Sequence, residues 1–406
     1  MKSYDENLKI LKSITPKWTL NERIPLTNAL NRILASDIIA QDPHPAYPTS
    51  AMDGYAIKFN NQDQKIKVIN ITPAGHDSDI NINDGQCIKT LTGALVCNQA
   101  DTIVPIENVK FDGEYIEIIK KVPKGFAIRD IGESYKAKEL LIKAGTKLGY
   151  CELALLSELG YSYTNVLVAP RVALLSTGSE VLDIGQTREN KSQIYSSNSI
   201  SISSLLKLMG CEPIIMPIIK DDKQSIQNAV QNALNQADFL ITTGGVSVGD
   251  FDFMRDITRE AQIIVDGASI KPGRHIKVAK INNKFIFALP GFAYSAIVTC
   301  VLFFREFIEH SFGTNLAHKS KAILKDDYIK KSPYEEFSAA TLSNDNGVLK
   351  ISTESKKSGS SAIIGNLAGG AVLLRCPSHK TKLKAGEVVE YENNIIIKNI
   401  WYNNNC

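Results

Sequence analysis

The chain has 406 residues, of which 44% are hydrophobic and 22% are charged, which is typical of a folded protein with several domains. Its formal net charge is only +3, and no basic stretch carries interleaved aromatic residues, so nucleic acid is not an expected partner. The seven cysteines are widely spaced and form no CxxC pair. This spacing disfavours a disulfide framework and a structural zinc site, and favours a reducing compartment.

Neither the start of the chain nor its longest apolar run predicts contact with a membrane. Residues 1–6 lack the apolar core of a signal peptide. The run over residues 293–304 is too short for a bilayer, which takes about 20 apolar residues. We therefore expect a cytoplasmic protein without a membrane partner.

The first predicted element is a helix that begins near Ser3. Ser3 and Glu6 form a capping box, and apolar residues follow at helical spacing. A second helix is predicted over residues 27–37 from a similar spacing. Three prolines within residues 43–48 then interrupt regular structure.

The residue pattern changes over residues 49–136, where short runs of β-branched residues alternate with Gly, Asn and Asp turns. This pattern predicts a small all-β domain, with strands near residues 65–71, 101–106 and 115–120. A helical pattern returns at residues 150–159 and ends at Gly160, a residue suited to a C-cap. An inserted β domain implies that its two flanks belong to one domain.

From Pro170 onward, apolar strands alternate with helices, which predicts a mostly parallel sheet covered on both faces. Strands are expected at residues 171–176, 213–219, 238–242, 276–280 and 285–289. Helices are expected from Asn198 to about residue 209, from an Asp222 cap to residue 237, and over residues 293–309. Short strands and turns after residue 318 predict a second β domain.

The predicted fold class is therefore multi-domain α/β plus β. A central three-layer α/β/α domain is accompanied by an inserted β domain, a helical N-terminal domain and a C-terminal β domain. We expect these boundaries: residues 1–42 with 137–168 (linker and dimerisation), 43–136 (inserted β), 169–317 (α/β) and 318–406 (C-terminal β).

Three glycine-containing turns follow predicted strands of the α/β domain, at residues 176–180, 242–250 and 289–291. Ligands of open α/β sheets bind beyond the carboxyl ends of strands, where backbone N–H groups and helix N-termini converge. Such turns also occur without a ligand, but three in one domain favour an anion-binding site. Its candidate substrate-binding residues are Thr177, Gly178, Ser179, Thr243, Gly244, Gly245, Ser247, Gly249, Asp250, Pro290 and Gly291.

The carboxylates at these turns favour a magnesium ion between protein and phosphate. Asp250 stands where a P-loop has its lysine, and a carboxylate there repels phosphate unless a divalent cation lies between them. Glu180 and Asp252 supply further carboxylates, and Mg²⁺ takes one or two carboxylates together with substrate phosphates. Lys271 is a candidate for the missing positive charge, although by itself it is typical of a surface lysine.

Four segments together resemble the molybdopterin molybdenumtransferase (MoeA) family, which is related to the E domain of gephyrin. They are Ser50-Ala51-Met52-Asp53-Gly54-Tyr55-Ala56, Thr92-Gly93-Ala94, Ser176-Thr177-Gly178-Ser179-Glu180 and Gly244-Gly245-Val246-Ser247-Val248-Gly249. The resemblance extends in order over essentially the whole chain. It implies a homodimer whose cleft is shared between subunits, and an α/β domain similar to molybdopterin adenylyltransferase, which is itself a candidate partner.

The resemblance also implies a reaction and roles for single residues. Molybdenum from molybdate would be inserted into adenylyl-molybdopterin, with Mg²⁺-dependent release of AMP. Asp53, Glu180 and Asp252 match acidic catalytic and metal-binding positions of the family's cleft, and Lys271 matches a basic catalytic position. Thr92, Gly93 and Ser360 match substrate-binding positions.

Four positions depart from the family pattern. Ser134 and Ser196 stand where the family has carboxylates, Phe292 follows Leu-Pro-Gly in place of asparagine, and an expected arginine is replaced near Ala339. Fewer carboxylates weaken the affinity for bridging cations. We favour an active but divergent enzyme. The alternatives are a paralogue for another oxyanion such as tungstate, and a non-catalytic molybdopterin-binding carrier; a nucleotide hydrolase would leave Ser50–Ala56 without a role.

Overall fold

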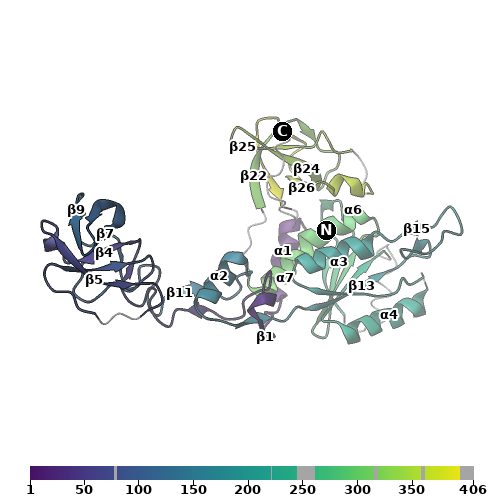
Figure 1. The fold of residues 1–406 in the computed structure, drawn as a ribbon. Coiled ribbons are helices and arrows are strands. Elements are labelled where there is room, and N and C mark those ends of the chain that lie inside the picture. The colour runs from purple at the N-terminus through teal and green to yellow at the C-terminus, as the bar shows by residue number, and fades with distance from the viewer. Residues whose placement is uncertain (77–79, 221, 245–260, 315–318, 358–361, 394–406) are drawn as a thin grey trace. The chain divides into compact units, whose positions relative to one another are not determined.

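The computed structural model describes residues 1–76, 80–220, 222–244, 261–314, 319–357 and 362–393 (Figure 1). The chain divides into two compact units, which we describe separately. The large unit comprises Met1–Ala35, Gly145–Ser157 and Tyr161–Cys406, and the small unit comprises Ser36–Ala144 with Glu158–Gly160. The division into four domains at the boundaries given above stays a prediction.

Helix α1 (Tyr4–Ile14) begins where the capping box predicts. The Ser3 side chain accepts a hydrogen bond from the backbone N–H of Glu6, and the Glu6 carboxylate accepts one from the backbone N–H of Ser3 at 2.8 Å. Tyr4, Leu8 and Leu11 are buried on one face of the helix and belong to the main core of the large unit.

The prediction of a helix over residues 27–37 is wrong. The structure has a short 3-10 turn, η1 (Leu26–Asn28), followed by residues whose backbone groups pair with other segments. Asn31 takes a positive φ of 65°, which ends a right-handed helix, and its N–H donates to the carbonyl of Leu148. Ile33 and Leu34 are buried through β-bridges. Apolar spacing that fits a helix thus arises here from irregular extended chain.

A six-stranded sheet forms the centre of the large unit, in the order β16-β13-β17-β21-β20-β18. Its first four strands are parallel, while β20 and β18 run antiparallel to their neighbours. The strands are β13 (Arg171–Ser176), β16 (Glu212–Ile215), β17 (Phe239–Thr243), β18 (Gln262–Asp266), β20 (Lys277–Ile281) and β21 (Lys284–Leu289). A mostly parallel sheet is therefore confirmed.

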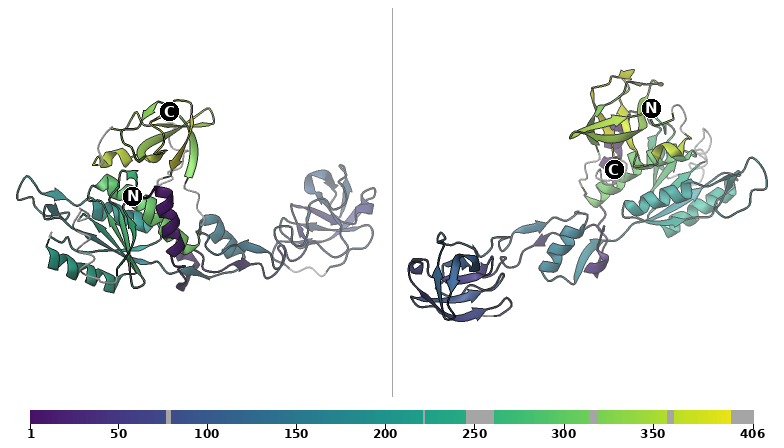
Figure 2. Two further views of the ribbon diagram at one scale, coloured as in Figure 1. Left: turned by 180° about the vertical axis from the view of Figure 1, so that it is seen from behind. Right: turned by 45° about the horizontal axis from the view of Figure 1, so that its top comes forward.

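Helices cover both faces of this sheet, as the predicted three-layer fold requires (Figures 1 and 2). Apolar residues of α3 and α6 pack on one face in one core cluster, and those of α4 pack on the other face in a second cluster. The helices are α3 (Asn198–Leu208), α4 (Lys223–Gln236), α6 (Ala293–Thr299), the π-helical turn η4 (Cys300–Phe304) and α7 (Arg305–Phe312).

The two predicted helix caps have different outcomes. Asp222 caps α4 as predicted, because its side chain accepts a hydrogen bond from the backbone N–H of Ser225 at 2.8 Å. Asn198 does not cap α3: it is the first helical residue, and Ser197 precedes it without a side-chain cap. The Asn198 amide instead donates to the carbonyl of Gly291 at 2.8 Å, which ties α3 to the turn after β21.

The C-terminal part of the large unit is a small barrel, in agreement with the predicted second β domain. Strands β24, β25, β22, β28 and β26 pair in succession, and a β24–β26 pairing closes the ring. The strands are β22 (Lys319–Leu324), β24 (Glu335–Asp345), β25 (Val348–Ser352), β26 (Val372–Cys376) and β28 (Val388–Glu392). A two-residue strand, β19 (Ile270–Lys271), joins β24 in parallel.

The small unit contains a six-stranded sheet in the order β7-β4-β6-β5-β9-β8 around its own apolar core, which fits the predicted all-β domain. Its strands are β4 (Gly54–Ile57), β5 (Ile66–Thr72), β6 (Gln86–Thr90), β7 (Thr102–Pro105), β8 (Val109–Phe111) and β9 (Tyr115–Ile118). Two short pairs accompany it, β3 (Thr49–Ser50) with β10 (Ile128–Arg129) and β2 (Ile38–Ile39) with β11 (Leu140–Ile142).

The remaining elements are short. In the large unit, β1 (Asn21–Pro25) pairs with β12 (Tyr163–Leu167), β14 (Val181–Leu182) with β15 (Ile194–Tyr195), and β23 (Tyr328–Ile329) with β27 (Lys382–Leu383). Three 3-10 turns are η2 (Phe59–Asn61), η3 (Ile106–Asn108) and η5 (Ile364–Leu367), and α2 spans Tyr150–Glu158. No helix in the described part of the chain is both long and apolar enough to span a bilayer.

Candidate functional site

A cavity of about 480 Å³ lies at the carboxyl ends of β13, β17 and β21 in the large unit; we call it the strand-end cavity. It is lined by residues from all three turns, including Thr177, Gly244 and Gly291. A Cβ at Gly244 would lie 2.6 Å from the carbonyl oxygen of Thr177, and one at Gly291 would lie 3.4 Å from the Cα of Gly244. The three turns are therefore packed directly against one another.

Two buried polar atoms of this cavity have no hydrogen-bond partner among the described residues. They are Oγ1 of Thr177 and Oδ1 of Asn198. An unsatisfied buried polar atom costs about 1–3 kcal/mol, so a ligand that bonds to it recovers that free energy. Asn198 was not among the predicted site residues, because its sequence context indicated only a helix cap.

A chain of hydroxyl groups lies beside these atoms. Ser196 lines the cavity, and its Oγ is 2.7 Å from Oγ of Ser199. Ser199 in turn approaches Ser176 at 3.4 Å, and Ser176 approaches Oγ1 of Thr243 at 3.1 Å. At the departure Ser196, a buried hydroxyl network thus stands where the family resemblance implies a carboxylate.

Glu180 supplies a carboxylate at the rim of the strand-end cavity. Its side chain is exposed and folds back over the turn, so that a Cβ at Gly178 would lie 3.0 and 3.1 Å from its two carboxylate oxygens. Pro290 also lines the cavity, whereas Ser179 is exposed and is not among the lining residues.

Sequence reasoning did not propose several further lining residues: Val181, Ile194, Tyr195, Ser197, His275 and Phe292, of which Phe292 was noted only as a departure from the family pattern. Phe292 has 64% of its surface exposed, and an aromatic residue directly after a strand-end turn was an available signal. His275 and Tyr195 come from segments outside the three turns and carry no such signal. The candidates Gly245, Ser247, Gly249, Asp250, Asp252 and Ser360 lie outside the described residues.

Lys271 lines a second cavity, not the strand-end cavity. This second cavity has a volume of about 150 Å³ and lies between β19, α6 and the C-terminal barrel; we call it the lysine cavity. Pairing of β19 with β24 sets Lys271 opposite Glu336. Among the described residues, its lining contains one carboxylate, Glu336, and four lysines: Lys271, Lys331, Lys356 and Lys357.

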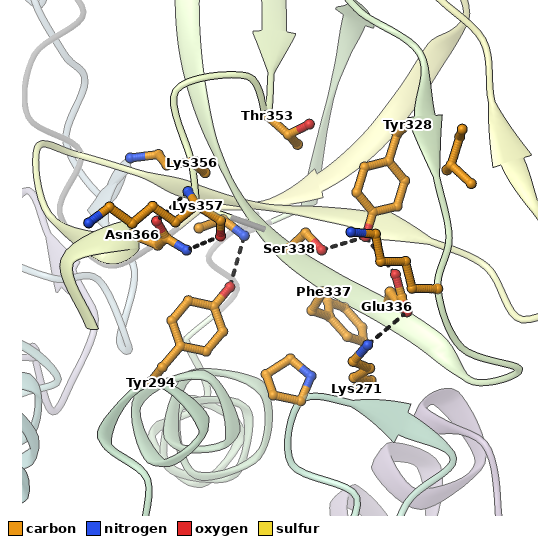
Figure 3. Close-up of a pocket in the computed structure, with 14 residues that line it drawn as sticks. Lys271, Tyr294, Tyr328, Glu336, Phe337, Ser338, Thr353, Lys356, Lys357 and Asn366 are labelled. Carbon is orange, nitrogen blue, oxygen red and sulfur yellow. Dashed lines mark hydrogen bonds and ion pairs between the residues drawn. The ribbon is translucent and has the colours of Figure 1, made fainter. Parts of the chain in front are cut away.

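Figure 3 shows how the polar groups of the lysine cavity are arranged. Glu336 is 4% exposed; one carboxylate oxygen accepts a hydrogen bond from the hydroxyl of Tyr328 at 2.6 Å, and the other is 3.6 Å from Nζ of Lys271. Burial and the Glu336 charge raise the pKa of Tyr328, so its phenol stays protonated and donates. Partial burial lowers the pKa of Lys356. Ala339, a predicted departure, lines the same cavity.

The motif of residues 50–56 lies in the small unit, where Asp53 is held by Thr92. Its Oδ1 accepts hydrogen bonds from the backbone N–H of Thr92 at 2.8 Å and from the Thr92 hydroxyl at 2.9 Å. These bonds lower the pKa of Asp53, so the carboxylate is ionised at neutral pH. The next position, Gly54, requires glycine, because a Cβ there would lie 2.5 Å from the carbonyl oxygen of Val104.

Two other candidates of the small unit lie near the same motif. The N–H of Gly93 donates to the carbonyl of Ser50 at 2.8 Å, which holds the Thr92–Gly93 turn against the motif. The departure Ser134 accepts a hydrogen bond from Arg129 at 3.0 Å, and the same guanidinium contacts Glu133 at 3.1 Å. A hydroxyl here still has a cationic partner, although it adds no charge.

Within the described ranges, no three His, Cys, Asp or Glu side chains gather closely enough to hold a metal ion. Glu180 in the large unit and Asp53 in the small unit therefore do not belong to such a cluster within the described residues.

Comparisons with known proteins cover nearly the whole chain. Family models match over residues 2–160 (MoeA N-terminal region, domain I and II), 173–310 (probable molybdopterin binding domain) and 321–393 (MoeA C-terminal region, domain IV). Molybdopterin molybdenumtransferase of Staphylococcus aureus strain COL is 32% identical over 380 residues, 90% of each chain. The Haemophilus influenzae protein of that name is 32% identical over 295 residues, 72% of each.

A solved structure shows the same fold. The molybdopterin biosynthesis MoeA protein of Pyrococcus horikoshii OT3 superposes with a TM-score of 0.83 at 28% identity, covering 97% of this chain and all of that one. With the two cavities, the Asp53 motif and these relatives considered together, the chain belongs to the molybdopterin molybdenumtransferase (MoeA) family.

Proposed function

We propose that this chain inserts molybdenum from molybdate into adenylyl-molybdopterin and releases AMP in a Mg²⁺-dependent reaction. The observation that carries the proposal is a pair of cavities of different size and charge in a chain of this family. The strand-end cavity, at about 480 Å³, has the size of a cofactor site, whereas the lysine cavity, at about 150 Å³, suits a small anion.

The strand-end cavity is suited to the pterin phosphate and adenylate. Thr177 and Asn198 have polar atoms without partners, and the glycines let backbone N–H groups approach an anion closely. A Mg²⁺ ion would be held by Glu180 together with phosphate oxygens, and would neutralise the charge that builds up when the phosphoanhydride breaks. Asp252 and Asp53 stay candidates for the same role.

Asp53 is suited to binding a cation more than to moving a proton. Its lowered pKa keeps it ionised at neutral pH, whereas a general base works best with a pKa near the working pH. We infer that Asp53 and Thr92 reach the strand-end cavity of a second subunit, in a homodimer whose cleft is shared. The molybdopterin adenylyltransferase, which would supply the substrate, stays a candidate partner.

The lysine cavity is suited to molybdate. Four lysines against one carboxylate leave an excess of positive charge, and Ser338 and Thr353 add hydroxyl donors. A tetrahedral dianion accepts hydrogen bonds on all sides, which matches a lining rich in ammonium groups. In this proposal, Lys271 therefore binds the oxyanion. The sequence had suggested a different role, in which Lys271 supplies the positive charge that the phosphate-binding turn lacks.

The test is AMP release by the purified chain with adenylyl-molybdopterin, Mg²⁺ and molybdate. Glu180→Gln is expected to lower the rate by at least about tenfold, the lower end for loss of a group that supports a metal. Glu189→Gln is the matched control, because Glu189 is exposed and does not line the cavity. If the unaltered chain releases no AMP above a protein-free sample, the carrier function replaces the proposed one.

The shared cleft has a separate test. Dimers of the Asp53→Asn chain and dimers of the Glu180→Gln chain are each expected to be slower by at least about tenfold, and mixed dimers of the two should recover activity. Recovery requires that one intact site be assembled from two different subunits. Mixed dimers as slow as either parent would show that both residues act within one subunit.

A further inference from the structure

We propose that Glu336 is an internal counter-anion of the lysine cavity, which keeps its hold on the oxyanion weak and reversible. In this arrangement Lys271 is shared: it pairs with Glu336 in the empty cavity and turns to the oxyanion when one enters. The inference rests on the proposed function, because it takes the lysine cavity as the molybdate site.

The two oxygens of Glu336 are satisfied unequally. One accepts a hydrogen bond from Tyr328 at 2.6 Å. The other is buried, receives no hydrogen bond from the described residues, and lies 3.6 Å from Nζ of Lys271. A charge-assisted hydrogen bond to a carboxylate is about 2.7–2.9 Å long, so this ion pair is loose.

The lysine of this loose pair is exposed, whereas the glutamate is buried. The Lys271 side chain is 43% exposed, whereas that of Glu336 is 5% exposed. A lysine ammonium on a flexible stem can leave one partner for another, and a carboxylate fixed by Tyr328 cannot follow it. In Figure 3 a dashed line joins Lys271 to Glu336. When an oxyanion fills the cavity, Lys271 has two anions within reach, and Glu336 remains as a fixed negative charge at the edge of the cavity.

Two neighbouring buried glutamates of the barrel have close arginine partners. Glu335 contacts the guanidinium of Arg375 at 2.5 Å, and Glu392 contacts that of Arg305 at 3.1 Å. Both are paired with arginines that are at most 13% exposed. Glu392 also has an oxygen without a hydrogen bond, 4.0 Å from Nζ of the exposed Lys319, but it keeps Arg305 as a close partner. Among these three buried carboxylates of the barrel, Glu336 is the one that lines the lysine cavity and has a lysine as its one ion-pair partner in the described part of the chain.

A weak site suits an anion that is a substrate. An oxyanion that is to be inserted elsewhere must enter the cavity and also leave it, and sites built for passage combine attraction with easy release. Four lysines without a counter-anion would retain any dianion, phosphate and sulfate included. Glu336 lowers that attraction by repelling the ligand and by competing for Lys271.

The first experiment compares molybdate affinity by calorimetry in the full-length chain and in Glu336→Gln. Glutamine keeps an oxygen that accepts from Tyr328 and removes the charge. We expect about tenfold tighter binding, which corresponds to the repulsion of a single and a double charge about 6 Å apart in water. Glu354→Gln, an exposed glutamate of the same barrel that does not line the cavity, should leave the affinity unchanged.

The outcomes separate the inference from the proposed function. Equal or weaker binding by Glu336→Gln would overturn the inference and leave molybdate binding intact. An unaltered chain that binds no molybdate would overturn the proposed role of the lysine cavity itself.

A second pair of variants tests whether Lys271 is shared. Lys271→Met should weaken molybdate binding, and adding Glu336→Gln to it should tighten binding by less than in the original chain, because no lysine is left to compete for. Equal tightening in both backgrounds would show that Glu336 acts by repulsion alone. Unfolding temperatures of all variants, compared with that of Glu354→Gln, show whether each remains folded.

Discussion

Gly244→Ala is expected to destabilise the large unit more than a glycine replacement elsewhere in the same unit, and Gly210→Ala is the matched control. Both glycines have a left-handed φ, 84° and 82°, so each alanine incurs the same backbone penalty of about 1–2 kcal/mol. At Gly244 the new Cβ would lie 2.6 Å from the carbonyl oxygen of Thr177, whereas at Gly210 the nearest atom is Phe312 Cε2 at 3.8 Å. Overpacking of this kind costs about 1–3 kcal/mol, which is therefore the expected difference between the two variants.

Urea unfolding followed by tryptophan fluorescence measures this difference. Trp18 packs against Phe239 of β17, with ring centroids 5.8 Å apart, and so reports on the sheet that carries Gly244. Gly244→Ala should also lose affinity for adenylyl-molybdopterin, because relief of the overlap moves the turn away from Thr177. Equal destabilisation by the two alanines, with unchanged affinity, would refute the close packing of the strand-end turns.

Three further predictions follow from single side chains. Thr92→Val should raise the pKa of Asp53 toward its ordinary value, because the hydrogen bond from the Thr92 hydroxyl, which favours the ionised carboxylate, is lost. On acidification, the stability that the ionised Asp53 contributes should then be lost at a higher pH than in the original chain. An unchanged pKa of Asp53 in an NMR titration would contradict this prediction. Molybdate affinity should fall as the pH rises from neutral to alkaline, because the lowered pKa of Lys356 makes it lose its proton at a lower pH than an ordinary lysine. In calorimetry, Lys356→Arg should flatten this pH profile, because an arginine side chain stays charged. Arg305→Met should destabilise the large unit by about 3–5 kcal/mol in urea unfolding, because Glu392 is left buried with only the distant ammonium of Lys319, 4.0 Å away, as its ion-pair partner among the described residues. Replacement of both Arg305 and Glu392 by apolar residues should restore most of the loss.

The α/β part of the fold could be predicted because its signals are local and regular. Continuous apolar strands, the Asp222 cap and glycine at strand ends each act within a few residues, and parallel strands bring their carboxyl ends to one edge. The same locality misled the prediction for residues 27–37. Apolar spacing there fits a helix, but the backbone pairs with residues more than a hundred positions away.

The lysine cavity was beyond sequence reasoning for a related reason. Lys271 and Glu336 are 65 positions apart, and they meet only because β19 joins β24 in register. No pattern near Lys271 indicates a carboxylate partner or three further lysines. Its basic character was visible in the sequence, whereas the choice between two cavities depends on a pairing that only the three-dimensional structure contains.

The pairing of β19 with β24 also constrains how such a chain can evolve. β19 belongs by sequence to the α/β part, yet it lies at the edge of the barrel sheet, with Ile270 opposite Glu335 and Lys271 opposite Glu336. A slip of one residue in the register of β19 against β24 would set Lys271 opposite a neighbour of Glu336, whose side chain points to the other side of the sheet. The barrel is therefore a poor candidate for exchange between relatives as a self-contained module. Substitutions in β19 and in β24 should be inherited together, because the two strands depend on each other's register.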